Sequence, residues 1–69
     1  MKYNYDKQTD ILTIELKRKK PDFAAQTGNI ITHYDKKNKP VEIEILDAIK
    51  TTKSMLNAIH GKKVAVGEA

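Results

Sequence analysis

The chain contains no cysteine, which excludes disulfide bonds and thiolate metal sites. Its three glycines are scattered, at Gly28, Gly61 and Gly67, so no glycine-rich phosphate loop is present. No nucleophile elbow and no catalytic set of cysteine and histidine occurs either. We therefore expect no enzymatic activity, no catalytic residue, no cofactor and no small-molecule substrate.

Long hydrophobic runs are also missing. No segment approaches the ~18 consecutive apolar residues of a membrane span. Residues 1–6 lack the apolar stretch of a signal peptide. The absence of cysteine is compatible with a reducing compartment. Together these absences predict a cytoplasmic protein that has no membrane partner.

Charge, in contrast, is plentiful and mostly carried by lysine. Lys and Arg number 13 against 9 acidic residues, which gives a net charge of +4, and Arg18 is the only arginine. Lysine lacks the planar fork with which arginine reads phosphates and guanines. Aromatic residues that could stack on bases are few, namely Tyr3, Tyr5, Phe23 and Tyr34. The basic excess therefore favours solubility over nucleic-acid reading.

At 69 residues the chain is one small domain. A chain of this length buries only about 60% of its unfolded surface, and a single core then supplies about 3–5 kcal/mol. No disulfide is available to add stability. Dimerisation or binding to a partner chain is the remaining source of extra stability.

Alternating apolar and polar residues predict short strands. Val41, Ile43 and Ile45 alternate with Glu42 and Glu44, the pattern of a strand with one dry face and one wet face. Similar patterns predict strands over residues 1–5, 11–16 and 30–34, with a short edge strand over 23–27. Polar turns at 6–10 and 35–40 join these strands into two hairpins.

The pattern changes to a helical period after Asp47, which we expect to be the helix N-cap. Ile49, Thr52, Leu56 and Ile59 recur at spacings of three and four. We predict an α+β fold: a small antiparallel sheet of four or five strands, with one C-terminal amphipathic helix packed on one face. Residues 1–61 form this domain, and residues 62–69 form a tail that is flexible or ordered by a partner.

One helix can cover only one face of such a sheet. The expected core consists of Tyr3, Leu12, Ile14, Leu16, one of Ile30 and Ile31, Val41, Ile43, Ile45, Ile49, Leu56 and Ile59. Apolar side chains that point the other way are left for a second chain. The candidate interface residues are Ile11, Ile30 and Leu46. If Ile31 rather than Ile30 points away from the face that the helix covers, Ile31 takes its place.

Four motifs in this order resemble a known family. They are Tyr5-Asp6, the strand Ile-Leu-Thr-Ile-Glu-Leu at 11–16, Gly-Asn-Ile-Ile-Thr-His-Tyr-Asp at 28–35, and Glu-Ile-Glu-Ile-Leu-Asp-Ala at 42–48. The chain is similar over about residues 1–50 to the short prokaryotic proteins of domain-of-unknown-function family 2283. It departs from them at residues 36–39, where lysines replace a usually acidic turn.

The resemblance implies no activity and no catalytic residues. Some members of the family are similar to, or encoded beside, components of toxin–antitoxin pairs. By association, the resemblance implies a role in which this chain is the small, antitoxin-like partner of a toxin.

Several carboxylates and histidines could bind a metal ion, but each also has a simpler structural explanation. Glu42 and Glu44, joined by Glu15, could bind a hard cation, but they also fit the solvated face of an amphipathic strand. We expect His33 to be a rim residue and His60 a cation at the helix C-terminus, so no metal site is predicted. The aspartates at turns, Asp6, Asp10, Asp35 and Asp47, are expected to cap free backbone N–H groups.

The best candidate patch is basic and lies in two loops that share one end of the sheet. It consists of Lys17, Arg18, Lys19, Lys20, Lys36, Lys37 and Lys39. Such a cluster could bind an anion or a phosphate backbone without reading sequence. The leading functional hypothesis is a non-enzymatic protein-interaction module, a homodimer or a complex with a small protein partner. The alternative is a nucleic-acid-binding module that uses these loops.

Overall fold

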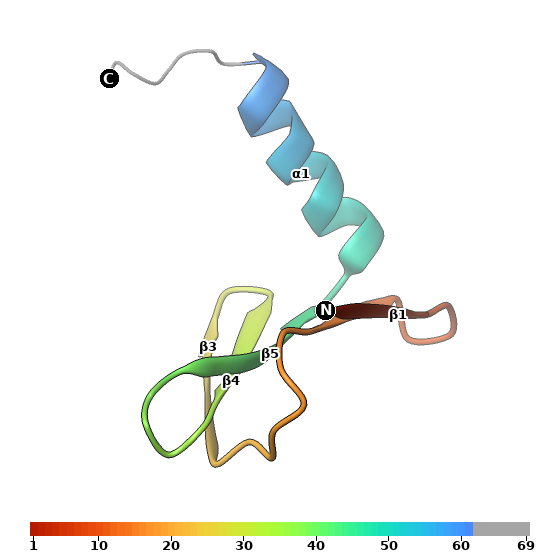
Figure 1. The fold of residues 1–69 in the computed structure, drawn as a ribbon. Coiled ribbons are helices and arrows are strands. Elements are labelled where there is room, and N and C mark those ends of the chain that lie inside the picture. Colours follow the sequence, from red (N-terminus) through yellow and green to blue (C-terminus); the bar gives the residue numbers. More distant parts are fainter. Residues whose placement is uncertain (62–69) are drawn as a thin grey trace.

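The computed structural model describes residues 1–61, so the predicted tail at 62–69 lies outside the described residues. The elements are β1 (Lys2–Asp6), β2 (Ile11–Glu15), β3 (Phe23–Thr27), β4 (Ile30–Tyr34), β5 (Pro40–Ile45) and α1 (Ala48–Gly61) (Figure 1). Five strands form one open sheet and a single helix follows it, which confirms the predicted α+β class.

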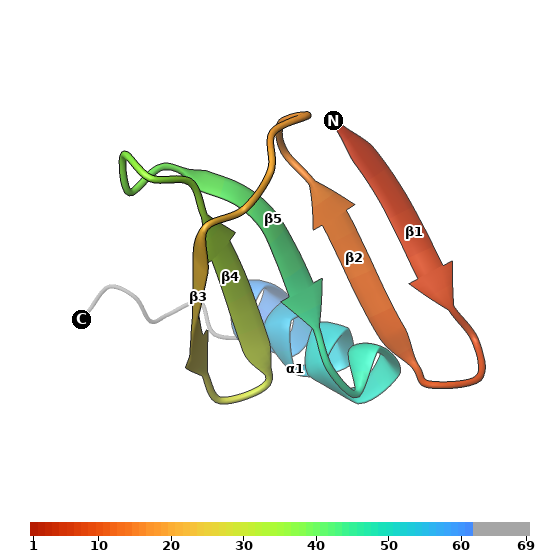
Figure 2. The same cartoon turned by 90° about the horizontal axis from the view of Figure 1, so that it is seen from below.

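The sheet has the strand order β1-β2-β5-β4-β3 and every neighbouring pair is antiparallel (Figure 2). The last strand in sequence, β5, therefore occupies the centre and joins the hairpin β1–β2 to the hairpin β3–β4. Leu12 lies opposite Ile45, and Ile14 opposite Ile43, so apolar residues share one face. Opposed residues lie on the same side of a pleated sheet, and Glu44 accordingly lies on the other face.

A bulge interrupts the ladder between β4 and β5. Tyr34 is opposite Pro40, whereas the preceding His33 is opposite Glu42, so Val41 is the extra residue. The Val41 carbonyl still accepts hydrogen bonds from two backbone N–H groups after β2, and its side chain is only 1% exposed. Because an extra residue shifts the pairing by one, the bulge decides which β5 side chains share a face with those of β4.

Aspartates shape the turns as the sequence predicts. Asp6 Oδ1 accepts the Gln8 N–H at 3.0 Å. Asp35 Oδ1 accepts the N–H groups of Lys37 at 2.8 Å and Lys39 at 3.0 Å. These bonds fix the tight turns that end β1 and β4.

The base of α1 is held between two turns. The Ala48 N–H donates to the Asp10 carbonyl at 2.9 Å, and the Ile49 N–H donates to Asp10 Oδ1 at 3.2 Å. On the other side, the Leu46 N–H donates to the Asn29 carbonyl at 2.8 Å. The helix starts between the β1–β2 and β3–β4 turns and points away from the sheet (Figure 1).

Asp47 occupies the predicted N-cap position, since its carbonyl accepts the Thr51 N–H at 2.8 Å, but the side chain that caps the first turn is that of Asp10. Asp47 adopts a left-handed backbone with φ of 48°, because the chain reverses sharply between β5 and α1. An N-cap residue normally has an extended backbone, from which its side chain can reach the first turn. Asp10, 39 residues before Ile49, supplies the capping oxygen instead.

The prediction that α1 packs on the sheet is also wrong for the single chain. Within residues 1–61 the buried hydrophobic residues are Val41, Ile45 and Ala48. The expected core residues Ile49, Leu56 and Ile59 are 63%, 53% and 71% exposed, and Tyr3 is 67% exposed. The reason is the orientation of the helix, since its clamped base makes the helix axis rise away from the sheet, so the apolar stripe does not reach the sheet surface (Figure 1).

Candidate functional site

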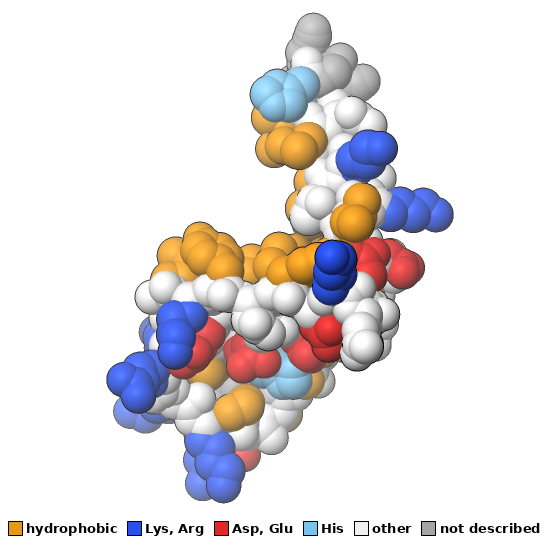
Figure 3. Space-filling view, turned by 90° about the vertical axis from the view of Figure 1, so that its right-hand side faces the viewer, with side chains coloured by type: hydrophobic (Ala, Val, Ile, Leu, Met, Phe, Trp, Pro, Cys, Tyr) orange, Lys and Arg blue, Asp and Glu red, His pale blue; other side chains and the backbone are white. Residues whose placement is uncertain are grey.

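Within residues 1–61 an uncovered apolar surface lies where the sheet meets the helix, and we call it the apolar corner. Its sheet side consists of Met1, Tyr3, Tyr5, Leu12, Ile14, Ile30 and Ile43, and its helix side of Ile49, Met55, Leu56 and Ile59. Hydrophobic side chains run along the upper surface of the sheet and up the adjoining side of the helix (Figure 3). Scattered exposed apolar residues are ordinary, whereas a patch of neighbouring ones is a candidate interaction surface.

The floor of the corner is tied to the base of the helix by one carboxylate. The Tyr5 hydroxyl donates to Asp10 Oδ1 at 2.7 Å, and the same oxygen accepts the Ile49 N–H. This hydrogen bond is the main reason that the pKa of Tyr5 is raised above its usual value of 10.0. The angle between the sheet and the helix is therefore set by bonds at their junction, not by packing along the helix.

A second cluster lies on the opposite, polar face of the sheet. His33 Nε2 is 2.8 Å from Glu44 Oε1, and Glu42 completes a group whose ligand atoms all lie within 4.8 Å of one another. All three residues are half-buried. The sequence predicts His33 as an isolated rim residue, but the register brings it to two carboxylates. The bulge next to His33 sets this register, and the sequence carries no signal for it.

His60 takes no part in this cluster, since it lies near the far end of α1. The candidate interface residues also divide between faces. Ile11 and Ile31 lie on the polar face, opposite Asp6 and Glu44, whereas Ile30 is opposite Ile45 on the apolar face. The Leu46 carbonyl, at the base of the helix, accepts a hydrogen bond from the Thr51 hydroxyl.

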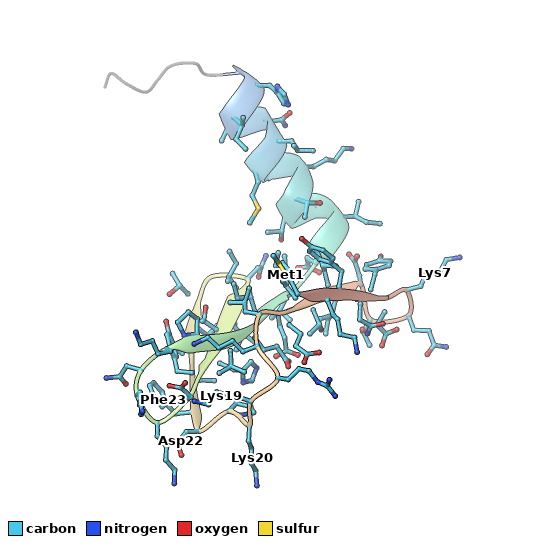
Figure 4. All side chains as sticks on the ribbon, in the orientation of Figure 1. Met1, Lys7, Lys19, Lys20, Asp22 and Phe23 are labelled. Carbon is cyan, nitrogen blue, oxygen red and sulfur yellow. The ribbon has the colours of Figure 1, made fainter. Side chains whose placement is uncertain are left out.

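The basic loops meet at the end of the sheet that is remote from the helix. Lys19, Lys20, Lys36 and Lys37 line one hollow together with Asp35, and Figure 4 places Lys19 and Lys20 beside each other there. The rest of the predicted patch lies elsewhere: Lys17 and Arg18 line a separate shallow hollow with Met1, Lys2, Glu15 and Leu16, and the Lys39 backbone is bonded to Asp35. The structure thus brings four of the seven predicted cations into one hollow.

Asp35 compensates part of this positive charge. It is 4% exposed, and its Oδ2 lies 3.3 Å from Lys19 Nζ. The hydrogen bond from the Lys39 N–H is the main influence that lowers its pKa, and desolvation opposes it. The Lys37 N–H and Lys19 lower it further, to about 2 from a usual value of 3.8. The hollow therefore contains a fixed negative charge beside its lysines.

The comparisons with known proteins give a family but no function. No curated protein and no solved structure matches the chain. Within residues 1–61, no helix is long and apolar enough to cross a membrane. The family model described as "Protein of unknown function (DUF2283)" matches residues 2–48, which span the whole sheet and end at the first residue of α1. The match covers more than half of the chain and agrees with the resemblance seen in its motifs, so the chain belongs to the DUF2283 family.

Proposed function

We propose that the protein is a non-enzymatic protein-interaction module that acts as a homodimer through its apolar corner. The observation that carries the proposal is the exposure of Ile49, Leu56 and Ile59 along one side of α1. Their spacing of seven and three residues puts them on one helix face. An amphipathic helix of this kind is stable when its apolar face is covered, because its stability comes mainly from packing.

A second copy of the chain is the occupant that best fits the corner. A helix with an apolar stripe needs a sheet, and a sheet with an apolar face needs a helix. Each copy supplies both surfaces, so two copies related by a twofold axis cover each other and leave nothing unpaired. To cover its own sheet, the helix would have to break the hydrogen bonds that its base donates to Asp10 and Asn29.

The dimensions support this arrangement. With 14 residues, α1 is about 21 Å long at ~1.5 Å per residue, and five strands spaced ~4.8 Å apart span about 20 Å. Aromatic side chains bury ~200 Å² each, which is an upper figure for aliphatic ones. On that basis the exposed residues of the corner present at most roughly 800 Å², which approaches the share of one partner in a standard stable interface.

A charge placed on the apolar stripe tests the dimer. Leu56→Lys is expected to convert the dimer to a monomer in sedimentation equilibrium, because the lysine head group cannot be buried unpaired. Ser54→Lys is the matched control: it adds the same charge to the same helix, on the face opposite the stripe. This variant is expected to remain dimeric.

Two results would contradict the proposal. One is a wild-type protein that stays monomeric across the whole concentration range, and the other is a Leu56→Lys variant that dimerises as tightly as Ser54→Lys. A wild-type monomer would assign the corner to a different chain. A toxin is the partner class that the family resemblance implies, and mixing the purified chains would then test it.

A second candidate function is binding to a nucleic-acid backbone. It is favoured by one observation, the convergence of Lys19, Lys20, Lys36 and Lys37 on one hollow. In a DNA or RNA shift assay, the logarithm of the association constant should fall linearly with the logarithm of salt concentration. Lys20→Gln should weaken binding more than Lys7→Gln, which removes the same charge from the β1–β2 turn (Figure 4). No binding at low salt would remove this candidate.

A further inference from the structure

We propose that His33, Glu42 and Glu44 bind a divalent transition-metal ion of the zinc class on the polar face of the sheet. This site is independent of the dimer, because it lies on the face opposite the apolar corner. It would link β4 to β5 at the centre of the sheet. The proposal concerns binding and does not assign a reaction to the ion.

The bulge between β4 and β5 creates the site. In an uninterrupted ladder that keeps Tyr34 opposite Pro40, His33 would face Val41, and the two glutamates would lie on the other side of the sheet. The extra residue moves His33 opposite Glu42 instead. Glu44, two positions further along β5, then projects from the same face. Bulges are common next to functional sites because they redirect side chains in this way.

The distances suit a metal ion after small rotamer changes. The three ligand atoms lie within 4.8 Å of one another, and His33 Nε2 is 2.8 Å from Glu44 Oε1. Zinc binds nitrogen and carboxylate oxygen at ~2.0–2.2 Å, which puts neighbouring ligands of a tetrahedral ion about 3.4 Å apart. The His33 and Glu44 side chains are 25% and 28% exposed, so water can complete the coordination.

The donor atoms select the class of ion. One imidazole nitrogen and two carboxylate oxygens suit zinc and its neighbours among the divalent first-row metals. Calcium and magnesium prefer sites built from oxygen alone. The chain has no cysteine, so no thiolate ligand can contribute to this site.

The surrounding charges also favour a cation. Glu15 lies directly opposite Glu42 across β2 and β5, and like charges in this position destabilise a sheet. Lys2 lies opposite Glu15 in the neighbouring strand, but within residues 1–61 the lysine salt bridge is Lys19–Asp35, so Glu42 forms none. A divalent ion bound by Glu42 and Glu44 would neutralise this negative surface.

Titration calorimetry of the full chain with zinc chloride alone tests the site. We expect one zinc ion per chain and much weaker binding of magnesium chloride. His33→Gln and Glu42→Gln should each weaken zinc binding by at least ~10-fold, since even the loss of an outer partner of a metal ligand has an effect of this size. His60→Gln, the control that removes the other histidine, should leave zinc binding unchanged.

A second measurement locates the ion without any variant. Substoichiometric Mn²⁺ should broaden the wild-type amide NMR signals around His33 and Glu44 before those of α1, and zinc should suppress that broadening. The proposal is overturned by an absence of zinc binding at millimolar concentration. It is equally overturned if His33→Gln, shown to be folded by circular dichroism, binds as tightly as wild type, or if broadening centres on His60.

Discussion

The two faces of the sheet differ in how their side chains are satisfied. On the polar face, His33 and Glu44 bond to each other within the chain. On the apolar face, Tyr3 and the stripe of α1 remain in water, and only Val41 and Ile45 are buried along β5. Polar groups can be satisfied by a neighbour or by water, but an apolar face gains stability only when something covers it. The apolar face is therefore the one that a second layer would stabilise.

Truncating an apolar side chain should therefore lower the free energy of unfolding more on the apolar face than on the polar face. This is the largest effect that we predict. Ile45 is 6% exposed, and Ile45→Ala should lower the free energy of unfolding by about 3 kcal/mol. Ile31 is half-buried on the polar face, and Ile31→Ala should have an effect closer to 1 kcal/mol because less of its side chain leaves water. Urea unfolding at a fixed protein concentration measures both. Equal losses would mean that the two faces are equally buried.

The apolar face is uncovered because the base of the helix is fixed, and a pair of glycine variants tests this. Asp10 and Asp47 both have a positive φ, of 57° and 48°, so glycine fits either position without strain. Asp10→Gly removes two side-chain hydrogen bonds, to Tyr5 and to Ile49. It should cost about 1–2 kcal/mol. Asp47→Gly should change stability by less than ~0.5 kcal/mol.

Hydrogen exchange of the α1 amides provides the second readout for this pair. Asp10→Gly should speed exchange at the start of the helix, where Ile49 loses the acceptor for its N–H. Asp47→Gly should leave the exchange pattern nearly intact. If the Asp47 variant were the more damaging one, the local cap expected from the sequence would be the true one.

The sequence predicts the elements well because their signals are local. The alternation of Val41, Ile43 and Ile45 marks β5, and the helical period that follows marks α1, both close to their observed bounds. The motifs that carry the family resemblance lie mainly in β1, β2, β4 and β5. Amphipathic patterns identify which side of an element is apolar, and this information does not depend on the rest of the fold.

The predictions that failed depend on contacts between distant residues. Asp10 caps a helix that begins 38 residues later, and no local pattern could indicate this bond. The bulge at Val41 adds one residue to β5, and the alternation of that strand gives no sign of it. That single shift places His33 beside Glu44, so the metal-site candidate could not be derived from sequence. A helical stripe likewise does not say which sheet it will cover.

The smallest expected effect concerns the turn held by Asp35. This turn adjoins the bulge, which determines the face on which the β4 and β5 side chains lie. Because the folded-state pKa of Asp35 is about 2, below its usual value of 3.8, its ionised form stabilises the fold. That contribution is complete above about pH 4 and is lost as the pH falls towards about 2. Melting temperature should therefore decline across this window in the wild type. The Asp35→Asn variant has no ionisable group at this position. It should be less stable than the wild type at pH 6, and its melting temperature should decline less steeply as the pH falls. An identical acid decline in both proteins would show that Asp35 does not stabilise this turn through its charge.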